Sequence, residues 1–422
     1  MNEHFYTLSL TNSKKANIFS FAKLFNGLLL IASIIIAVVP DLNRYFPKSI
    51  WTIILVAWYL SFFYLLLAKQ ASLKIRTFLL SLFAFFGLQL FYRVVGYSSA
   101  SIGNYFLMIV HYDLIIKSLF VLENYCYRNR VLIWRLLQTI ILILIVLNIY
   151  WGLVLDRPHF LIFYYPESYV GKNIAQTEFY NMLVFYVGIC LFSLFRAKRI
   201  VQKLFDIFCI ITALYFIVFF ETRVTCLFFS LLALFLGFAC SLKKLTSRIA
   251  VMIVTISVVS LFVLYLGSSL PSFLPERVAV RMEAIADSIY GGSEESEYLQ
   301  RFKLVGNSLS TFLASPINMI FGTGYHLGDE YYGIIGQHSF FTDVLVAYGT
   351  IGFILLLFYL TSLFQIFTSK NNGDVLSIRY FSYMFFVFVL VSIFSNSFTP
   401  QNSFSFFFCF ALLSKKEERF FL

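Results

Sequence analysis

The sequence predicts an all-α protein, a polytopic bundle of about 12 transmembrane helices with one large helical loop on the outer side. Hydrophobic residues make up 60% of the 422 positions and charged residues only 13%, whereas soluble domains are about half apolar and a quarter charged. The apolar residues also form runs of about 17–22 residues, the length of a helix that crosses a bilayer. These runs lack the alternation of a transmembrane β-barrel strand.

Each predicted span is an apolar run bounded by polar or charged residues. The whole chain, 1–422, is expected to be one integral-membrane domain. No cleavable signal peptide is evident, because the first apolar run is long enough to remain as a span. The six cysteines show no CxxC spacing, so neither a disulfide framework nor a zinc site is indicated. We place spans at about 21–39, 50–68, 77–95, 102–121, 136–155, 179–195, 204–220, 224–241, 249–267, 340–367, 380–395 and 402–413.

The basic residues predict the orientation of the chain. With the N-terminus inside, the inner segments hold 21 of the 32 Lys and Arg residues, as the positive-inside rule requires. This pattern predicts a multi-pass protein of the cell inner (cytoplasmic) membrane. The net charge of +11 is then explained by the orientation of the spans in the membrane, and no nucleic-acid partner is expected.

The longest polar stretch, residues 268–337, is the predicted outer loop. Two segments within it, 276–290 and 294–315, carry helical apolar spacing, and Pro316 is expected to end the second helix. A loop of this length with its own helices is usually functional. Within the second segment, the apolar residues that recur at three- and four-residue intervals mark one helix face; they are Tyr298, Phe302, Val305, Leu309 and Phe312.

Glu221 and Arg223 lie at a tight outer turn between two spans. Charged side chains inside or at the outer edge of a membrane bundle cost free energy, so each needs a partner or a functional role. One interpretation is a local Glu–Arg pair, or an arginine that snorkels to the headgroups. The other is an arginine at the bottom of an outward cavity, where it could bind a phosphate bidentately.

Further basic residues lie on the outer side. Arg301 and Lys303 stand on the second loop helix, and Arg277 and Arg281 on the first. A solvated helix face explains these side chains as well as substrate binding does. Arg93, at the end of the third span, either reaches the same cavity or snorkels to the headgroups.

The segment GQHSFFTDVLVAYGTIG, residues 336–352, places His338 at the start of a span. His338 either caps this helix or belongs to a reaction centre. A neutral histidine is suited to accept a proton near physiological pH. Gly349 and Gly352 predict a packing notch where another helix approaches closely.

The fourth span is interrupted by His111, Asp113 and Lys117. Asp113 and Lys117 are four residues apart, so a neutralising pair within one helix is the simpler interpretation. A proton relay for transport is the alternative.

Several of these elements together resemble a known family. They are ETRVTC at the outer turn, EYLQRFKLV on the loop helix, IFGTGYH, and His-Ser followed after nine residues by GxxG. Over residues 219–356 this order is similar to the O-antigen polymerase and O-antigen ligase superfamily (Wzy and WaaL types). The usual Ser-Arg of the family is Thr222-Arg223 in this chain. Arg281 and Gly292 also fit a loose arginine–glycine spacing of the polymerases.

The resemblance implies an integral-membrane glycosyltransferase that uses undecaprenyl-diphosphate-linked oligosaccharides on the outer face of the cytoplasmic membrane. By position, Arg223 and Arg301 would contact the diphosphate of the donor, and His338 would lie beside the acceptor hydroxyl or the leaving group. The remaining candidates for substrate binding are Arg281, Arg277, Lys303, Glu221 and Arg93.

We expect neither a cofactor nor a metal, because the chain has no DxD pair and a diphosphate is a good leaving group. The expected partners are the lipid-linked oligosaccharide, membrane lipid and, as a candidate, a chain-length regulator. Polymerisation of repeat units is preferred, and an O-antigen ligase that acts on lipid A-core is the near alternative. A flippase or transporter is a third hypothesis, which the polar fourth span supports.

Overall fold

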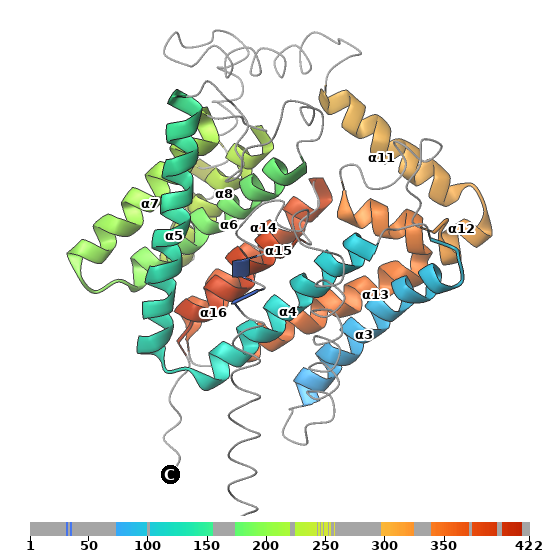
Figure 1. Ribbon diagram of the computed structural model, residues 1–422, viewed down its shortest axis with the longest axis horizontal. Coiled ribbons are helices and arrows are strands. Elements are labelled where there is room, and N and C mark those ends of the chain that lie inside the picture. The colour runs from blue at the N-terminus through green and yellow to red at the C-terminus, as the bar shows by residue number, and fades with distance from the viewer. Residues whose placement is uncertain are drawn as a thin grey trace, which may run out of the picture.

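The computed structural model describes residues 31–32, 34–35, 73–98, 102–154, 174–219, 224–242, 297–324, 339–370, 374–394 and 399–415, with isolated positions between 244 and 257. The regular elements within these ranges are helices, which confirms the all-α class for the described part of the chain (Figure 1). They are α3 (Leu73–Val94), α4 (Ile102–Asn124), α5 (Tyr127–Val154), α6 (Ile174–Arg196), α7 (Ile200–Phe219), α8 (Val224–Ser241), α11 (Glu297–Leu313), α12 (Pro316–Phe321), α13 (Phe340–Lys370), α14 (Val375–Phe394), α15 (Pro400–Ser403), the π-helical turn η4 (Phe404–Phe408) and α16 (Cys409–Leu413).

Five helices in these ranges are long and apolar enough to cross a membrane, namely Lys74–Val94, Tyr127–Tyr150, Ile200–Ile217, Phe340–Ser369 and Val375–Ile393. The chain is therefore a multi-pass α-helical membrane protein. The helices from α3 to α8 and from α13 to α16 follow the predicted spans, although α5 begins earlier than predicted. The predicted spans at 21–39, 50–68 and 249–267 lie largely outside the described residues.

The helices pack as one bundle in which distant segments of the chain lie together. α13 packs along α3, α6 packs against α7 and α8, and α14 contacts α8 and α13. The C-terminal segment α15–η4–α16 packs against α4, α5 and α6 at the centre of the bundle (Figure 1). The end of the chain thus fills the core that earlier helices surround.

Phenylalanine supplies much of this core. Phe381 of α14 stacks on Phe367 of α13, with ring centroids 4.9 Å apart, and on Phe406 of η4, at 5.3 Å. All three side chains are fully buried. Such aromatic pairs add about 0.5–1.5 kcal/mol each beyond the area that they bury. Because lipid tails are as apolar as these rings, close packing rather than the hydrophobic effect holds the helices together.

The opposite faces of the helices are apolar and exposed. Leu132 and Leu136 of α5 are 72% and 62% exposed, and Ile200 and Leu204 of α7 are exposed similarly. A soluble protein rarely presents such a surface. These faces therefore suit contact with lipid.

A buried polar network joins α5, α6 and α7. The carboxylate of Asp206 accepts hydrogen bonds from Arg135 at 2.5 Å, from Gln138 at 2.8 Å and from Ser193 at 3.1 Å. Ser193 in turn accepts a hydrogen bond from the indole of Trp134. Asp206 is fully buried, so its charge depends on these donors.

An Asp206→Asn substitution is expected to destabilise the bundle by about 3 kcal/mol, because it leaves the Arg135 guanidinium without its carboxylate partner. The measurement is the thermal unfolding midpoint of the detergent-solubilised protein. Thr139→Val is the matched control, since Thr139 is exposed on α5, the helix of Arg135, and its hydroxyl donates to the carbonyl of Arg135. Equal midpoints for Asp206→Asn and Thr139→Val would show that the network adds no stability.

A second polar group joins the connection between α13 and α14 to α6. Asp374, which lies outside the spans, accepts hydrogen bonds from Arg196, from Ser377 and from the backbone N–H of Lys415. Burial raises the pKa of the Asp374 carboxyl, but the hydrogen bonds from Ser377 and the charge of Arg196 outweigh this and lower the pKa below its usual value. Asp374 is therefore charged at neutral pH and holds this end of the bundle together.

Candidate functional site

The glycine-rich return of the predicted loop forms a compact unit of α12 and the four residues that we call the glycine turn, Phe321–Gly324. α11 ends at Leu313, ahead of Pro316, as predicted, but Pro316 also begins α12. The Ser315 hydroxyl accepts a hydrogen bond from the Asn318 N–H at 3.1 Å, which caps α12. Proline at the first position of a helix is favourable because its missing N–H needs no partner there.

The glycine turn binds to a break in α13. Gly349 has φ +62° and ψ −164°, so α13 is interrupted at this residue. In an uninterrupted helix the carbonyls of Val346 and Ala347 would bond to the N–H groups four residues later. They accept instead from Thr323 N at 2.8 Å and Gly324 N at 3.0 Å. The glycine turn therefore satisfies the carbonyls that the break leaves unused.

The break requires a glycine for two reasons. A residue at positive φ with such a ψ is almost always glycine. In addition, a Cβ at Gly349 would lie 2.3 Å from the carbonyl oxygen of Ile320 in α12. The predicted notch at Gly349 is thus confirmed, and α12 is the helix that approaches it.

The end of α3 contacts the other side of the glycine turn. α3 ends in a Schellman motif, in which Tyr97 N bonds to Tyr92 O at 2.8 Å and Gly96 N to Arg93 O at 3.2 Å. Gly96 has φ +75°, which the motif needs. The motif brings the rings of Tyr92 and Tyr97 into an edge-to-face contact at 5.3 Å. Both hydroxyls then reach the glycine turn.

Side chains from two other helices cap the carbonyl end of α12. Tyr92 Oη donates to Phe321 O at 2.6 Å, and Tyr97 Oη donates to Gly322 O at 2.9 Å. Thr350 Oγ1, just after the break in α13, donates to Met319 O at 2.7 Å. Helix ends leave such carbonyls without partners, so α3 and α13 supply donors that α12 cannot supply itself.

α11 carries Arg301 and Lys303, as predicted, and it contacts both α12 and α13 (Figure 1). The side chains of Arg301 and Lys303 lie outside the part of the chain that the structure describes. On the predicted apolar face Leu309 is 39% exposed, whereas the neighbouring Ser308 is buried. Val305 is half-buried, and Phe312 packs on the core. Residues 305, 308 and 312 of α11 are therefore more deeply buried than Leu309. α11 as a whole packs against α12 and α13.

Ser339 caps the start of α13. Its hydroxyl accepts from Thr342 N at 3.3 Å, and its carbonyl accepts from Asp343 N at 2.9 Å. Ser339 is 3% exposed. His338 itself lies outside the described residues, so both interpretations of its role stay predictions.

Arg93 has a partner within its own helix end. Its guanidinium donates to Ser98 O at 3.1 Å, and the residue is exposed. This contact closes the turn that presents Tyr97, so Arg93 has a structural role, and its role in substrate binding stays a prediction. The other predicted site residues, Arg223, Glu221, Arg277 and Arg281, lie outside the described residues.

A second polar cluster is buried between α4, α13 and α15. The two ring nitrogens of His111 form hydrogen bonds with Tyr359 Oη at 3.3 Å and with Ser403 Oγ. Asp113 and Lys117 are also buried, and the charge of Asp113 acts on Lys117, in agreement with the simpler interpretation of the fourth span. The sequence offered no indication that Tyr359 and Ser403 would meet His111, since almost 250 and 300 residues separate them.

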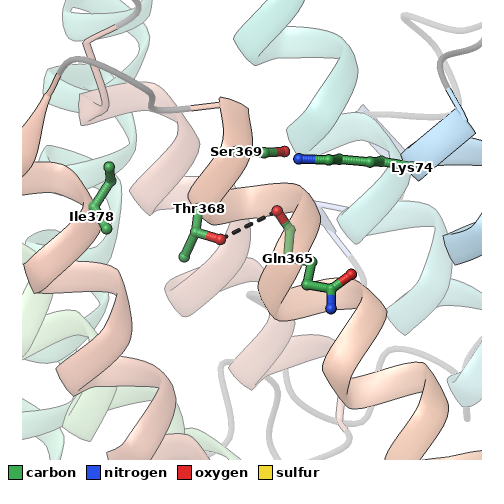
Figure 2. A pocket seen from close by; sticks show the side chains of 5 residues that line it. All are labelled: Lys74, Gln365, Thr368, Ser369 and Ile378. Atoms are coloured by element: carbon green, nitrogen blue, oxygen red, sulfur yellow. Dashed lines mark hydrogen bonds between the residues drawn. The ribbon is translucent and has the colours of Figure 1, made fainter.

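A cavity lies at the opposite end of α3 and α13 from the glycine turn. It has a volume of about 330 Å³ and is lined by Lys74, Gln365, Thr368, Ser369 and Ile378. Figure 2 shows the ammonium of Lys74 directed toward Ser369. Thr368 and Ser369 donate to carbonyls of their own helix, and Lys74 and Gln365 are the other polar residues that line this cavity. Arg93, a predicted site residue that the structure describes, is not among the residues that line this cavity.

The described bundle defines a multi-pass helical membrane protein in which the glycine turn is held between α3 and α13 at one end. Within the described ranges, no three His, Cys, Asp or Glu side chains form a group that could hold a metal ion. No protein-family model matches the chain, and no curated protein gives a significant match.

Proposed function

We propose that this protein polymerises undecaprenyl-diphosphate-linked oligosaccharide repeat units into a surface polysaccharide by inverting glycosyl transfer. In this proposal the chain forms about 12 spans in the cytoplasmic membrane, and residues 268–337 face outward. The donor then approaches from the lipid, already activated by its diphosphate. The proposal includes no metal or cofactor.

The observation that supports this proposal is the packing of α11, the glycine turn and α13 into one unit. α11 carries Arg301, and α13 begins two residues after His338. These elements are the ones that resemble the polymerase and ligase superfamily.

In the proposed reaction, the hydroxyl oxygen of the acceptor attacks C1 of the donor sugar from the side opposite the diphosphate. The bond between C1 and the diphosphate oxygen breaks, and undecaprenyl diphosphate leaves with the bonding electrons. His338 accepts the proton of the hydroxyl. Arg223 and Arg301 stabilise the negative charge that develops on the leaving diphosphate, and as arginines they stay charged throughout.

Transport is the second candidate, because α4 buries His111, Asp113 and Lys117 inside the bundle. Both nitrogens of His111 are bonded to hydroxyls of other helices, which favours a structural role. Buried ionisable groups in a span are nevertheless a common mark of proton relays. The ligase differs from the polymerase only in its acceptor.

Deletion of the gene in its native host separates these candidates. A polymerase predicts surface glycan with a single repeat unit on each acceptor. A ligase predicts full-length glycan that stays on the lipid carrier, and a flippase predicts repeat units trapped inside the cell. The chain-length distribution of the extracted surface glycan and lipid-linked glycan, measured by gel electrophoresis, gives the result. An unchanged distribution in the deletion strain would overturn the proposed function.

A further inference from the structure

The glycine turn is bonded on both sides by groups that the proposed chemistry does not use. Its N–H groups, at Thr323 and Gly324, donate to the carbonyls of α13 that the break exposes. Its carbonyls, at Phe321 and Gly322, accept from the hydroxyls of Tyr92 and Tyr97. The turn therefore has a fixed position relative to both α3 and α13.

The geometry points to Tyr92 and Tyr97 as positioning residues of the proposed transferase. Their hydroxyls hold the glycine turn, and the turn sets the relative placement of α11, which carries Arg301, and the start of α13, which follows His338. This inference rests on the proposed function, because it concerns the geometry of that site. Neither tyrosine is assigned a contact with the substrate.

The hydroxyls, rather than the rings, carry this role. The ring of Tyr92 packs on Tyr97 at 5.3 Å and on Tyr348 of α13 at 5.4 Å, and phenylalanine would keep both contacts. Only the hydrogen bonds to the glycine turn would be lost. A helix of six residues such as α12 is too short to be stable alone, so its position depends on groups outside it.

The end of α3 is built to present these two hydroxyls together. The Schellman motif with Gly96 folds Tyr97 back onto Tyr92, and Arg93 closes the same turn through Ser98. A second anchor comes from α13, where Thr350 donates to Met319 O. α12 is thus fixed from α3 and from α13 by three side-chain hydroxyls.

Misplacement of catalytic groups lowers the rate of the chemical step more than it weakens substrate binding. A shift of about 1 Å can cost on the order of 100-fold in rate. Loss of the two hydroxyls is therefore expected to lower kcat and to leave KM for the lipid-linked donor nearly unchanged. A direct substrate contact would instead raise KM.

The experiment compares Tyr92→Phe, Tyr97→Phe and the double variant with the wild type in purified, detergent-solubilised form. The donor is the lipid-linked repeat unit extracted from the deletion strain. We expect kcat to fall about tenfold for the double variant, with KM changed less than about twofold. Tyr150→Phe is the matched control, because Tyr150 is an exposed tyrosine of α5, away from the glycine turn.

Hydrogen exchange at the amides of Gly322, Thr323 and Gly324 supplies a readout that does not depend on activity. We expect faster exchange in the double variant and wild-type exchange in Tyr150→Phe. Thr350→Val is also expected to speed hydrogen exchange at these amides. Thr350→Ser keeps the hydroxyl, so we expect it to retain slow exchange and wild-type activity.

Unchanged exchange in the double variant would overturn the positioning role, as would a raised KM with unchanged kcat. Failure of the proposed function has a different signature. In that case the wild-type protein shows no transfer and the deletion strain keeps its glycan, while the exchange measurement still reports whether the tyrosines hold the turn. A double variant that does not fold is replaced by the two single variants, which each keep one hydroxyl.

Discussion

An Arg301→Ala variant is expected to reach the membrane at the wild-type level and to make no long-chain glycan. Under the proposed function, Arg301 offsets the negative charge that develops on the leaving diphosphate. Removal of one such donor typically lowers a rate about 10²–10³-fold, which is enough to remove a ladder of chain lengths. The measurement is glycan electrophoresis from the deletion strain that carries the variant, with the protein quantified by immunoblot.

Two variants on the same helix sharpen this test. Arg301→Lys keeps the charge but loses the planar fork that binds a phosphate bidentately, so we expect short chains at a reduced level. Ser310→Ala should be silent, since the Ser310 hydroxyl is exposed and donates only to the carbonyl of Asn307 in its own helix. A normal distribution of glycan chain lengths from Arg301→Ala would show that the charge of Arg301 is not needed for the transfer reaction.

The same reasoning applies to His338→Ala and Arg223→Ala, which are expected to abolish long chains as well. The structure adds a reason for His338 that was absent from the sequence pattern. Since Ser339 caps α13, loss of the histidine should leave the helix start intact. Normal glycan from all three variants would exclude the catalytic interpretation of these residues.

The sequence predicted the helices well because long apolar runs depend on composition alone. α8 matches its predicted span at both ends, and α4 at its start. Helix-breaking residues were also informative: Pro316 was predicted to end a helix, and Gly349, predicted as a packing notch, also interrupts α13. Such residues act locally, through a missing N–H or a backbone conformation, so that a single sequence reveals them.

Contacts between distant helices could not be predicted in this way. Tyr92 and Tyr97 were overlooked, although YRVVGY contains the glycine and the apolar pair of a Schellman motif. Their partner, the glycine turn, is about 225 residues away. On α11, the deeper burial of Ser308 than of Leu309 depends in the same way on where α12 and α13 lie. The hydroxyls that meet His111 likewise come from helices that only the fold brings together.

Among substitutions that add one methyl group in the described part of the chain, we expect Gly349→Ala to lower stability and activity the most. The alanine would need φ +62° and ψ −164°, a region occupied essentially by glycine alone, at a strain of about 1–3 kcal/mol. Its Cβ would also lie 2.3 Å from Ile320 O and 2.6 Å from Gly322 N. Both contacts are with backbone, so that relief requires α12 and the glycine turn to move away from α13.

This movement would separate Thr323 and Gly324 from the carbonyls that they bond, and the glycan ladder should disappear with a lower unfolding midpoint. Gly306→Ala is the matched control, because Gly306 lies within α11 and a Cβ there meets nothing within 4 Å. That substitution should stabilise the helix by about 0.5–1 kcal/mol and leave the ladder intact. If Gly349→Ala behaves like Gly306→Ala in both measurements, the break in α13 is not needed, and α12 has no fixed place against it.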